Sequence, residues 1–162
     1  KDALVLAFLE LRDQVWTVDL IVAEASRRGN TPEERLLAVF DVFGDWFQRE
    51  DFEACSFINV LLEMGAGHPL GKASIDYLSR IRGHIQALAE ERGYSWDFTA
   101  PGDSTRPSLI TPHPDRVMKL DWFAGKRLDC LGNGILSSLS GNAKPLSDHD
   151  CVWCTVQQKD TA

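Results

Sequence analysis

A change in composition near Gly93 constrains the fold more than any other feature of this sequence. Residues 1–93 contain sixteen acidic residues and only two prolines. Residues 94–162 contain five prolines, seven serines and eight aspartates, but no glutamate. Glutamate favours helix interiors, whereas aspartate and proline favour turns and helix ends. The break therefore predicts an all-α unit over residues 1–93, followed by a loop-rich, poorly structured tail over residues 94–162.

Four helices are predicted in the first part, over residues 2–28, 32–48, 52–64 and 69–92. In the first of them, apolar residues recur at steps of three and four and therefore fall on one helix face. These residues are Leu4, Phe8, Leu11, Val15, Val18 and Val22. The second helix has a similar apolar face that consists of Leu36, Phe40, Phe43 and Phe47. Four helices of this kind can bury a common core.

The second helix begins with a complete N-terminal signature. Thr31 can cap the helix, Pro32 fits the first helical position, and Glu34 can reach back to the amide of the capping residue. The signature predicts that this helix starts at residue 32.

The tail has one candidate helix, over residues 115–131, where Val117, Leu120 and Phe123 are apolar. Proline-containing segments at residues 111–114 and 142–145 are typical of loops. Two interpretations stay open for residues 94–162: a divergent native end, or a non-native, disordered product of a shifted reading frame. The absence of glutamate and the scattered prolines favour the second interpretation.

Charge and hydrophobicity argue against two broad classes of protein. A net charge of −7 is unsuited to nucleic-acid binding, because a basic surface is needed to neutralise phosphates. The longest uncharged apolar stretch in the middle of the chain, residues 54–62, is too short to cross a membrane. The four cysteines lack the spacing of a secreted disulfide framework, and no complete export signal is present. We therefore expect a cytoplasmic protein that does not bind membranes.

Two motifs point to a known family. Lys1 and Leu4 match part of the pattern Phe-x-x-Lys-x-x-Leu. The second motif combines Trp46-Phe47, Cys55-x-Phe57-Ile58-Asn59, Glu63 and His68-Pro69. Together they resemble the TetR/AcrR family of bacterial transcriptional regulators. In that family the first pattern closes the helix-turn-helix head, and the second motif is similar to the ligand-binding core of one branch.

The resemblance implies that residues 1–93 are the effector-binding domain of a transcriptional repressor, without most of its helix-turn-helix head. The intact protein would be a homodimer that binds operator DNA and releases it when a small, mostly apolar effector enters the helical pocket. Lys1 would lie near a DNA phosphate in that protein, whereas the chain itself is expected to show no specific DNA binding. The alternative is a stand-alone helical ligand-binding or dimerisation module.

Eight side chains are candidates for effector binding. Trp16, Phe43 and Phe47 could line an apolar pocket, but a stripe at helical spacing is more often core packing, and it is the family resemblance that adds weight to pocket contact. Cys55, Asn59 and Glu63 recur every four residues and share one helix face, where they could supply polar contacts. The alternative is that Cys55 packs as a small apolar residue and Glu63 reaches solvent. The last two candidates are Tyr77 and His84, on the apolar face of the fourth helix.

The sequence gives no specific support for an enzyme, a cofactor or a metal-dependent function. Paired carboxylates with a histidine partner and histidine pairs at metal-ligand spacing are both missing. One weaker pattern remains in the tail, where Cys130, His149, Cys151 and Cys154 could form a four-ligand zinc site. A chance occurrence of these residues in a non-native tail is the preferred interpretation.

Overall fold

The computed structural model describes residues 1–96, 121–142, 144, 147 and 150–160. The chain divides into two compact units, Lys1–Arg92 and Gly93–Ala162. None of the helices in the described ranges combines the length and the apolar character that a membrane crossing requires.

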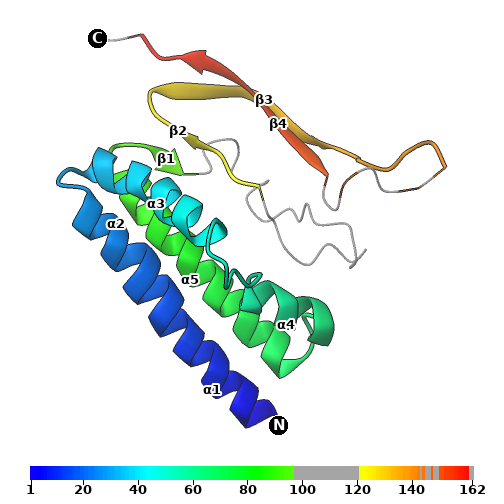
Figure 1. Ribbon diagram of the computed structural model, residues 1–162. Coiled ribbons are helices and arrows are strands. Elements are labelled where there is room, and N and C mark those ends of the chain that lie inside the picture. The colour runs from blue at the N-terminus through cyan, green and yellow to red at the C-terminus, as the bar shows by residue number, and fades with distance from the viewer. Residues whose placement is uncertain (97–120, 143, 145–146, 148–149, 161–162) are drawn as a thin grey trace. The chain divides into compact units, whose positions relative to one another are not determined.

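The unit Lys1–Arg92 consists of a long first helix and three further helices (Figure 1). The first helix runs without interruption through α1 (Asp2–Arg12), η1 (Asp13–Val22) and α2 (Ala23–Arg28). Its middle part, η1, is π-helical, so it forms a wider turn than the α-helical parts on either side. The helices α3 (Pro32–Phe47), α4 (Ser56–Met64) and α5 (Pro69–Glu91) follow. The segment 52–55, which was predicted to begin a helix, is not helical.

The start of α3 confirms the predicted capping box. The Thr31 hydroxyl accepts a hydrogen bond of 3.2 Å from the amide of Glu34, and the Glu34 carboxylate accepts one of 3.2 Å from the amide of Thr31. A different cap starts α5, where the Nδ1 atom of His68 accepts a hydrogen bond of 3.2 Å from the amide of Leu70. In both helices, side chains satisfy amides that have no partner within the helix.

The buried face of the first helix differs from the apolar stripe predicted for it. Leu4 and Leu11, which belong to that stripe, are 76% and 60% exposed. The buried residues are instead Leu9, Asp13, Trp16, Thr17, Ile21 and Ala25. Apolar residues occur on more than one side of this helix, so periodicity alone did not identify the face that packs.

The face predicted for α3 is also partly wrong. Phe40 is 71% exposed and Phe47 is 58% exposed, whereas Ala38, Val39 and Val42 are buried. The smaller side chains allow α3 to approach its neighbours closely, and α3 packs against α2 and α5. The aromatic residues of α3 are therefore distributed between the core and the surface.

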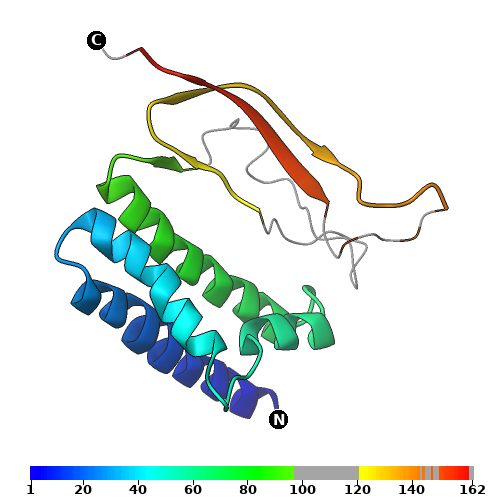
Figure 2. The ribbon, with the colours of Figure 1, turned by 45° about the horizontal axis from the view of Figure 1, so that its top comes forward.

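The prediction that the protein is all-α is wrong, because the unit Gly93–Ala162 contains β-structure. The short strands β1 (Ser95–Trp96) and β2 (Ala124–Gly125) form one antiparallel pair. The longer strands β3 (Leu128–Leu136) and β4 (Cys151–Gln158) form a second antiparallel pair, seen as a long two-stranded ribbon in Figure 2. Within the range 115–131 predicted as a helix, residues 124–125 and 128–131 lie in strands, and residues 115–120 lie outside the described residues.

Burial alternates along the first half of β4. Along β4, Val152 and Cys154 are half-buried, whereas Cys151 and Trp153 are exposed. This two-residue period is typical of a strand. The indole of Trp153 lies against Gly134 of β3, a position where a larger residue would collide with the ring. The glycines of β3, which weaken a helix, leave room for a large aromatic residue of the neighbouring strand.

Two glycines of α5 allow a matched test of packing. A Cβ atom at Gly71 would overlap the carbonyl oxygen of Gly65, whereas a Cβ atom at Gly83 would meet open space. We expect Gly71→Ala to destabilise the helical unit by about 1–3 kcal/mol through overpacking. Gly83→Ala should stabilise it by about 0.5–1 kcal/mol, because alanine favours helices. Urea unfolding of the full chain, followed by helical circular dichroism, measures both changes; equal effects of the two variants would contradict the packing of Gly71.

Candidate functional site

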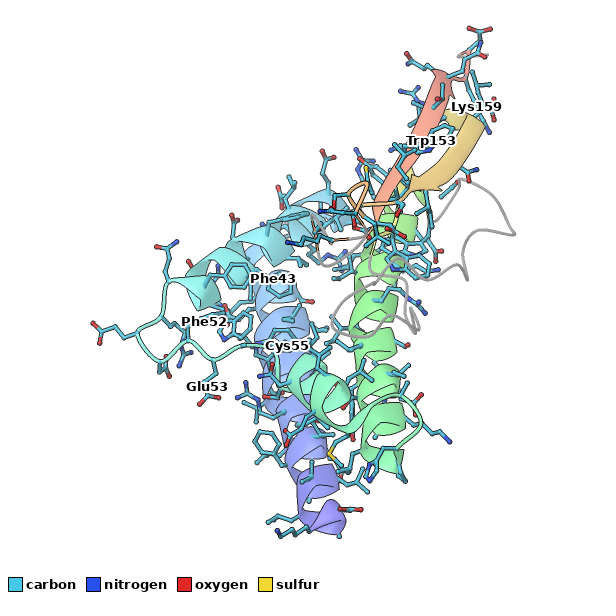
Figure 3. All side chains as sticks on the ribbon, turned by 90° about the vertical axis from the view of Figure 1, so that its right-hand side faces the viewer. Phe43, Phe52, Glu53, Cys55, Trp153 and Lys159 are labelled. Carbon is cyan, nitrogen blue, oxygen red and sulfur yellow. The ribbon has the colours of Figure 1, made fainter. Side chains whose placement is uncertain are left out.

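Trp16 is the centre of an aromatic cluster in the helical unit. Its ring lies 4.9 Å from the ring of Trp46, 5.9 Å from Phe43 and 6.4 Å from Phe57, measured between centroids. All three contacts are edge-to-face, which is a favourable geometry for aromatic pairs. Figure 3 shows Phe43 on α3 and Cys55 before α4, and both pack against the core that contains Trp16. The cluster thus joins the first helix to α3 and α4.

The aromatic contacts continue on both sides of Trp16. On one side, Phe47 and Phe52 contact Trp46 and each other and are 58% and 44% exposed. On the other side, Phe57 stacks on Tyr77 of α5 at 5.2 Å. Burial raises the pKa of the Tyr77 hydroxyl, with smaller effects of neighbouring charges. The chain of rings therefore extends from the surface beside α3 to the face of α5.

A charged pair lies next to this chain of rings. Arg80 donates a hydrogen bond of 2.9 Å to the buried carboxylate of Asp13, and the guanidinium lies 5.0 Å from the centre of the Tyr77 ring. The second oxygen of Asp13, the indole NH of Trp16, and the hydroxyls of Thr17 and Ser74 are buried with no hydrogen-bond partner among the described residues. Three of these four groups belong to the π-helical segment η1. Burial of a polar group without a hydrogen-bond partner is unfavourable.

An open pocket of about 310 Å³ borders the aromatic cluster. Trp16 and Trp46 form part of its wall, and four charged residues also line it: Arg12, Arg49, Asp51 and Glu53. Arg49 and Asp51 bond to each other through two hydrogen bonds of 2.8 and 2.7 Å. The pocket combines aromatic surface with charges of both signs.

A second open pocket, of about 380 Å³, lies between the first helix, α3 and α5. Buried Ile21 and Val39 contribute to its lining, together with Ile85 and Leu88 of α5. Its polar residues are Ser26, His84 and Glu91. A mostly apolar pocket with a few polar groups is the usual form of a small-molecule site, and its volume is in the range of such sites. We call it the His84 pocket.

The structure separates the predicted effector-binding residues into three groups. Trp16, Phe43, Cys55 and Tyr77 lie in or against the core, and Trp16 also borders the first pocket. Phe47, Asn59 and Glu63 are exposed, and none of the three lines either pocket described above. His84 lines the second pocket. The predicted row of Cys55, Asn59 and Glu63 therefore does not form a polar wall inside the bundle.

Several residues that shape these sites were not identified from the sequence. Asp13 and Arg80 are far apart in the chain, so no local spacing indicates that they pair. Ile85 and Leu88 lie near His84 on one helix face, and their spacing could have indicated that they share its pocket. Thr17 and Ser74 are buried polar residues with no signal in the sequence that distinguishes them from exposed ones.

The structure brings together only part of the predicted zinc site. The sulfurs of Cys130 and Cys154 are 3.8 Å apart, but Cys151 lies on the opposite face of β4 from Cys154. His149 lies outside the described residues. Among the residues that the structure describes, no group of three or more potential metal ligands is assembled.

Comparisons with known proteins identified no relative, so the function is inferred from the sequence and the geometry of the sites. No family model matches the chain, and no curated protein or solved structure has significant similarity to it.

The Asp13–Arg80 pair can be tested by a double-mutant cycle. Arg80→Ala leaves the Asp13 carboxylate buried without its partner, and we expect a loss of about 1–3 kcal/mol in unfolding free energy. Adding Asp13→Asn to this variant removes the charge and should recover part of the loss. Arg49→Ala, which breaks the exposed pair with Asp51, should have a much smaller effect. Urea unfolding measures the parent chain, Arg80→Ala, Asp13→Asn, the double variant and the Arg49→Ala control, and additive effects of the Arg80 and Asp13 substitutions would contradict the pairing.

Proposed function

We propose that the unit Lys1–Arg92 binds a small, mostly apolar molecule in the His84 pocket. The supporting observation is the lining of this pocket, which combines core residues such as Ile21 and Val39 with a few polar side chains. His84 is exposed and lines this pocket, so its ring can contact a ligand there. The carboxylate of Glu91 is already bonded to Arg35 at 3.2 Å. The ligand is therefore an apolar body with at least one group that can hydrogen-bond to an imidazole.

A ligand in this pocket contacts the first helix and α5 together. Ile21, Val22 and Ser26 belong to the first helix, and His84 and Leu88 belong to α5. A ligand binds more tightly to one separation of the two helices than to others, and it therefore shifts the population of the protein toward that separation. Typical couplings of this kind are about 1–3 kcal/mol, or about 5–150-fold in affinity.

We further propose that this response serves transcription regulation, in a repressor similar to the TetR/AcrR family. This step rests on the motifs at Lys1, Leu4 and residues 46–69. In such a protein, the first helix would transmit the change from the pocket to a helix-turn-helix head, and the dimer would release operator DNA. A helix-turn-helix head encoded in frame before Lys1 would support the proposal, whereas a start codon immediately before the codon of Lys1 would favour a stand-alone module.

Binding to the His84 pocket can be measured with Nile red, a neutral apolar dye that accepts hydrogen bonds. We expect a saturable rise in dye fluorescence with the full chain. Ala87→Trp places a large ring at the pocket and should weaken binding by about tenfold or more. His84→Ala should weaken it by a smaller factor, because it removes only one polar contact.

The matched control is Ser79→Trp, which adds the same ring at an exposed position of α5 outside the pocket lining. This variant should bind the dye as the parent chain does. If Ala87→Trp and Ser79→Trp bind the dye equally well, the dye does not occupy the His84 pocket and the proposed site is wrong.

A second candidate function is dimerisation through the first helix. Leu4, Phe8, Leu11 and Val15 share one face of this helix and are all at least 44% exposed. A continuous apolar face of this kind is unusual on a monomer surface and is typical of a protein–protein contact. A second copy of this chain is the partner proposed for it.

The dimerisation candidate predicts concentration-dependent self-association in sedimentation velocity. Leu4→Glu combined with Leu11→Glu should shift the chain to the monomer, because the substitutions place four charges at the contact of two copies. Ser79→Glu adds a charge on α5 and should leave the association unchanged. A parent chain that stays monomeric at all concentrations would contradict this candidate without affecting the His84 pocket.

A further inference from the structure

Two cysteine side chains meet across the β3–β4 pair. The sulfur of Cys130 on β3 lies 3.8 Å from the sulfur of Cys154 on β4, and both residues are half-buried. Asn133 donates a weak hydrogen bond of 3.6 Å to the sulfur of Cys130. Cys130 and Cys154 are both free thiols.

The register of the strands explains this close approach. Cys130 pairs with Val156, and Asn133 pairs with Cys154, so the two cysteines are diagonal neighbours rather than direct partners. In a regular ladder the Cβ atoms of diagonal neighbours are roughly 7–8 Å apart or slightly less, too far for a disulfide. A bulge interrupts this ladder between Cys130 and Gly132. Bulges bend a strand and increase its twist, and here the two sulfurs lie in contact at 3.8 Å.

Neither of the other two cysteines lies where it could form a disulfide with Cys130 or Cys154. Cys151 is exposed and, by the alternation of side chains along β4, lies on the same face as Trp153 and on the opposite face from Cys154. Cys55 belongs to the helical unit, where it packs against the core. Although Cys151 and Cys154 form the Cys-x-x-Cys pattern of the sequence, the strand directs their side chains to opposite faces. The three-dimensional pair is therefore Cys130 with Cys154.

We propose that Cys130 and Cys154 form a redox site that reacts with small-molecule disulfides, such as oxidised glutathione. The thiolate of one cysteine attacks the small disulfide, forms a mixed disulfide and releases one small thiol. The other cysteine then attacks the protein sulfur of the mixed disulfide, forms the Cys130–Cys154 bond and releases the second small thiol. The two protein thiols are oxidised, and the small disulfide is reduced to two thiols.

The bond has a direct structural consequence. It would connect β3 to β4 at the bulge, where the ladder of hydrogen bonds is interrupted. A two-stranded pair is only marginally stable in water, so a covalent link between its strands favours the paired arrangement. Reduction by excess thiol breaks the disulfide and restores the two free thiols, so the strands are again held together by hydrogen bonds alone.

The test uses the full chain treated with oxidised glutathione under native conditions. We expect the Cys130 and Cys154 thiols to be lost and a Cys130–Cys154 cross-link to appear in the peptide map. The exposed Cys151 can only form a mixed disulfide with glutathione, so the mass decrease of two hydrogen atoms is measured in the Cys151→Ser variant. Dithiothreitol should restore all four thiols. Cys151→Ser and Cys55→Ser are matched controls and should form the same cross-link at the same rate.

Removal of either partner should stop the reaction at its first step. In Cys154→Ser, the mixed disulfide with glutathione should persist on Cys130, and in Cys130→Ser it should persist on Cys154. In concentrated urea, selectivity for the Cys130–Cys154 pair should be lost, because the strands no longer hold the sulfurs together. A Cys151–Cys154 cross-link, the absence of any cross-link, or the same selectivity in urea would each overturn the proposal.

Discussion

The burial of Trp16 is the interaction on which the helical unit depends. Its ring contacts Phe43, Trp46 and Phe57, so one side chain of the first helix joins α3 and α4. Large aromatic residues dominate the energetics of small cores, and their edge-to-face contacts add directional preference. Once Trp16 points inward, the rotation of the first helix about its axis is fixed. The exposure of Leu4 on another side of the helix follows from that rotation.

Local chemistry made part of the fold predictable. The capping box at Thr31 and Glu34 depends on neighbouring residues, and its hydrogen bonds are present. The buried face of the first helix depends on contacts with other helices. The periodic spacing of Leu4 and Leu11 predicted that they face the core, but both are exposed. The β3–β4 pair escaped prediction because its glycines resemble loop chemistry until Trp153 of the other strand is placed over them.

The candidate sites were predictable to a smaller extent. His84 was identified from its position on the apolar face of the fourth helix, and it lines a pocket. Asn59 and Glu63 were selected because they share a helix face, but that face is exposed. Spacing along one helix shows which side chains lie together, whereas only packing shows whether they face the interior. The Asp13–Arg80 contact could be identified only from the structure, because it joins two helices that are distant in the chain.

The π-helical segment Asp13–Val22 has a consequence for how the two ends of the first helix are related. In an α-helix each residue turns the chain by about 100°. The hydrogen-bond pattern of the segment Asp13–Val22 therefore sets the rotation of the preceding segment, Asp2–Arg12, about the helix axis. A π turn closes its hydrogen bonds one residue later than an α turn does. If one turn of the segment changed from the π to the α pattern, the helix before Asp13 would rotate relative to Ile21. The backbone hydrogen-bond pattern of the segment that contains Trp16 therefore determines the direction in which Leu4 faces.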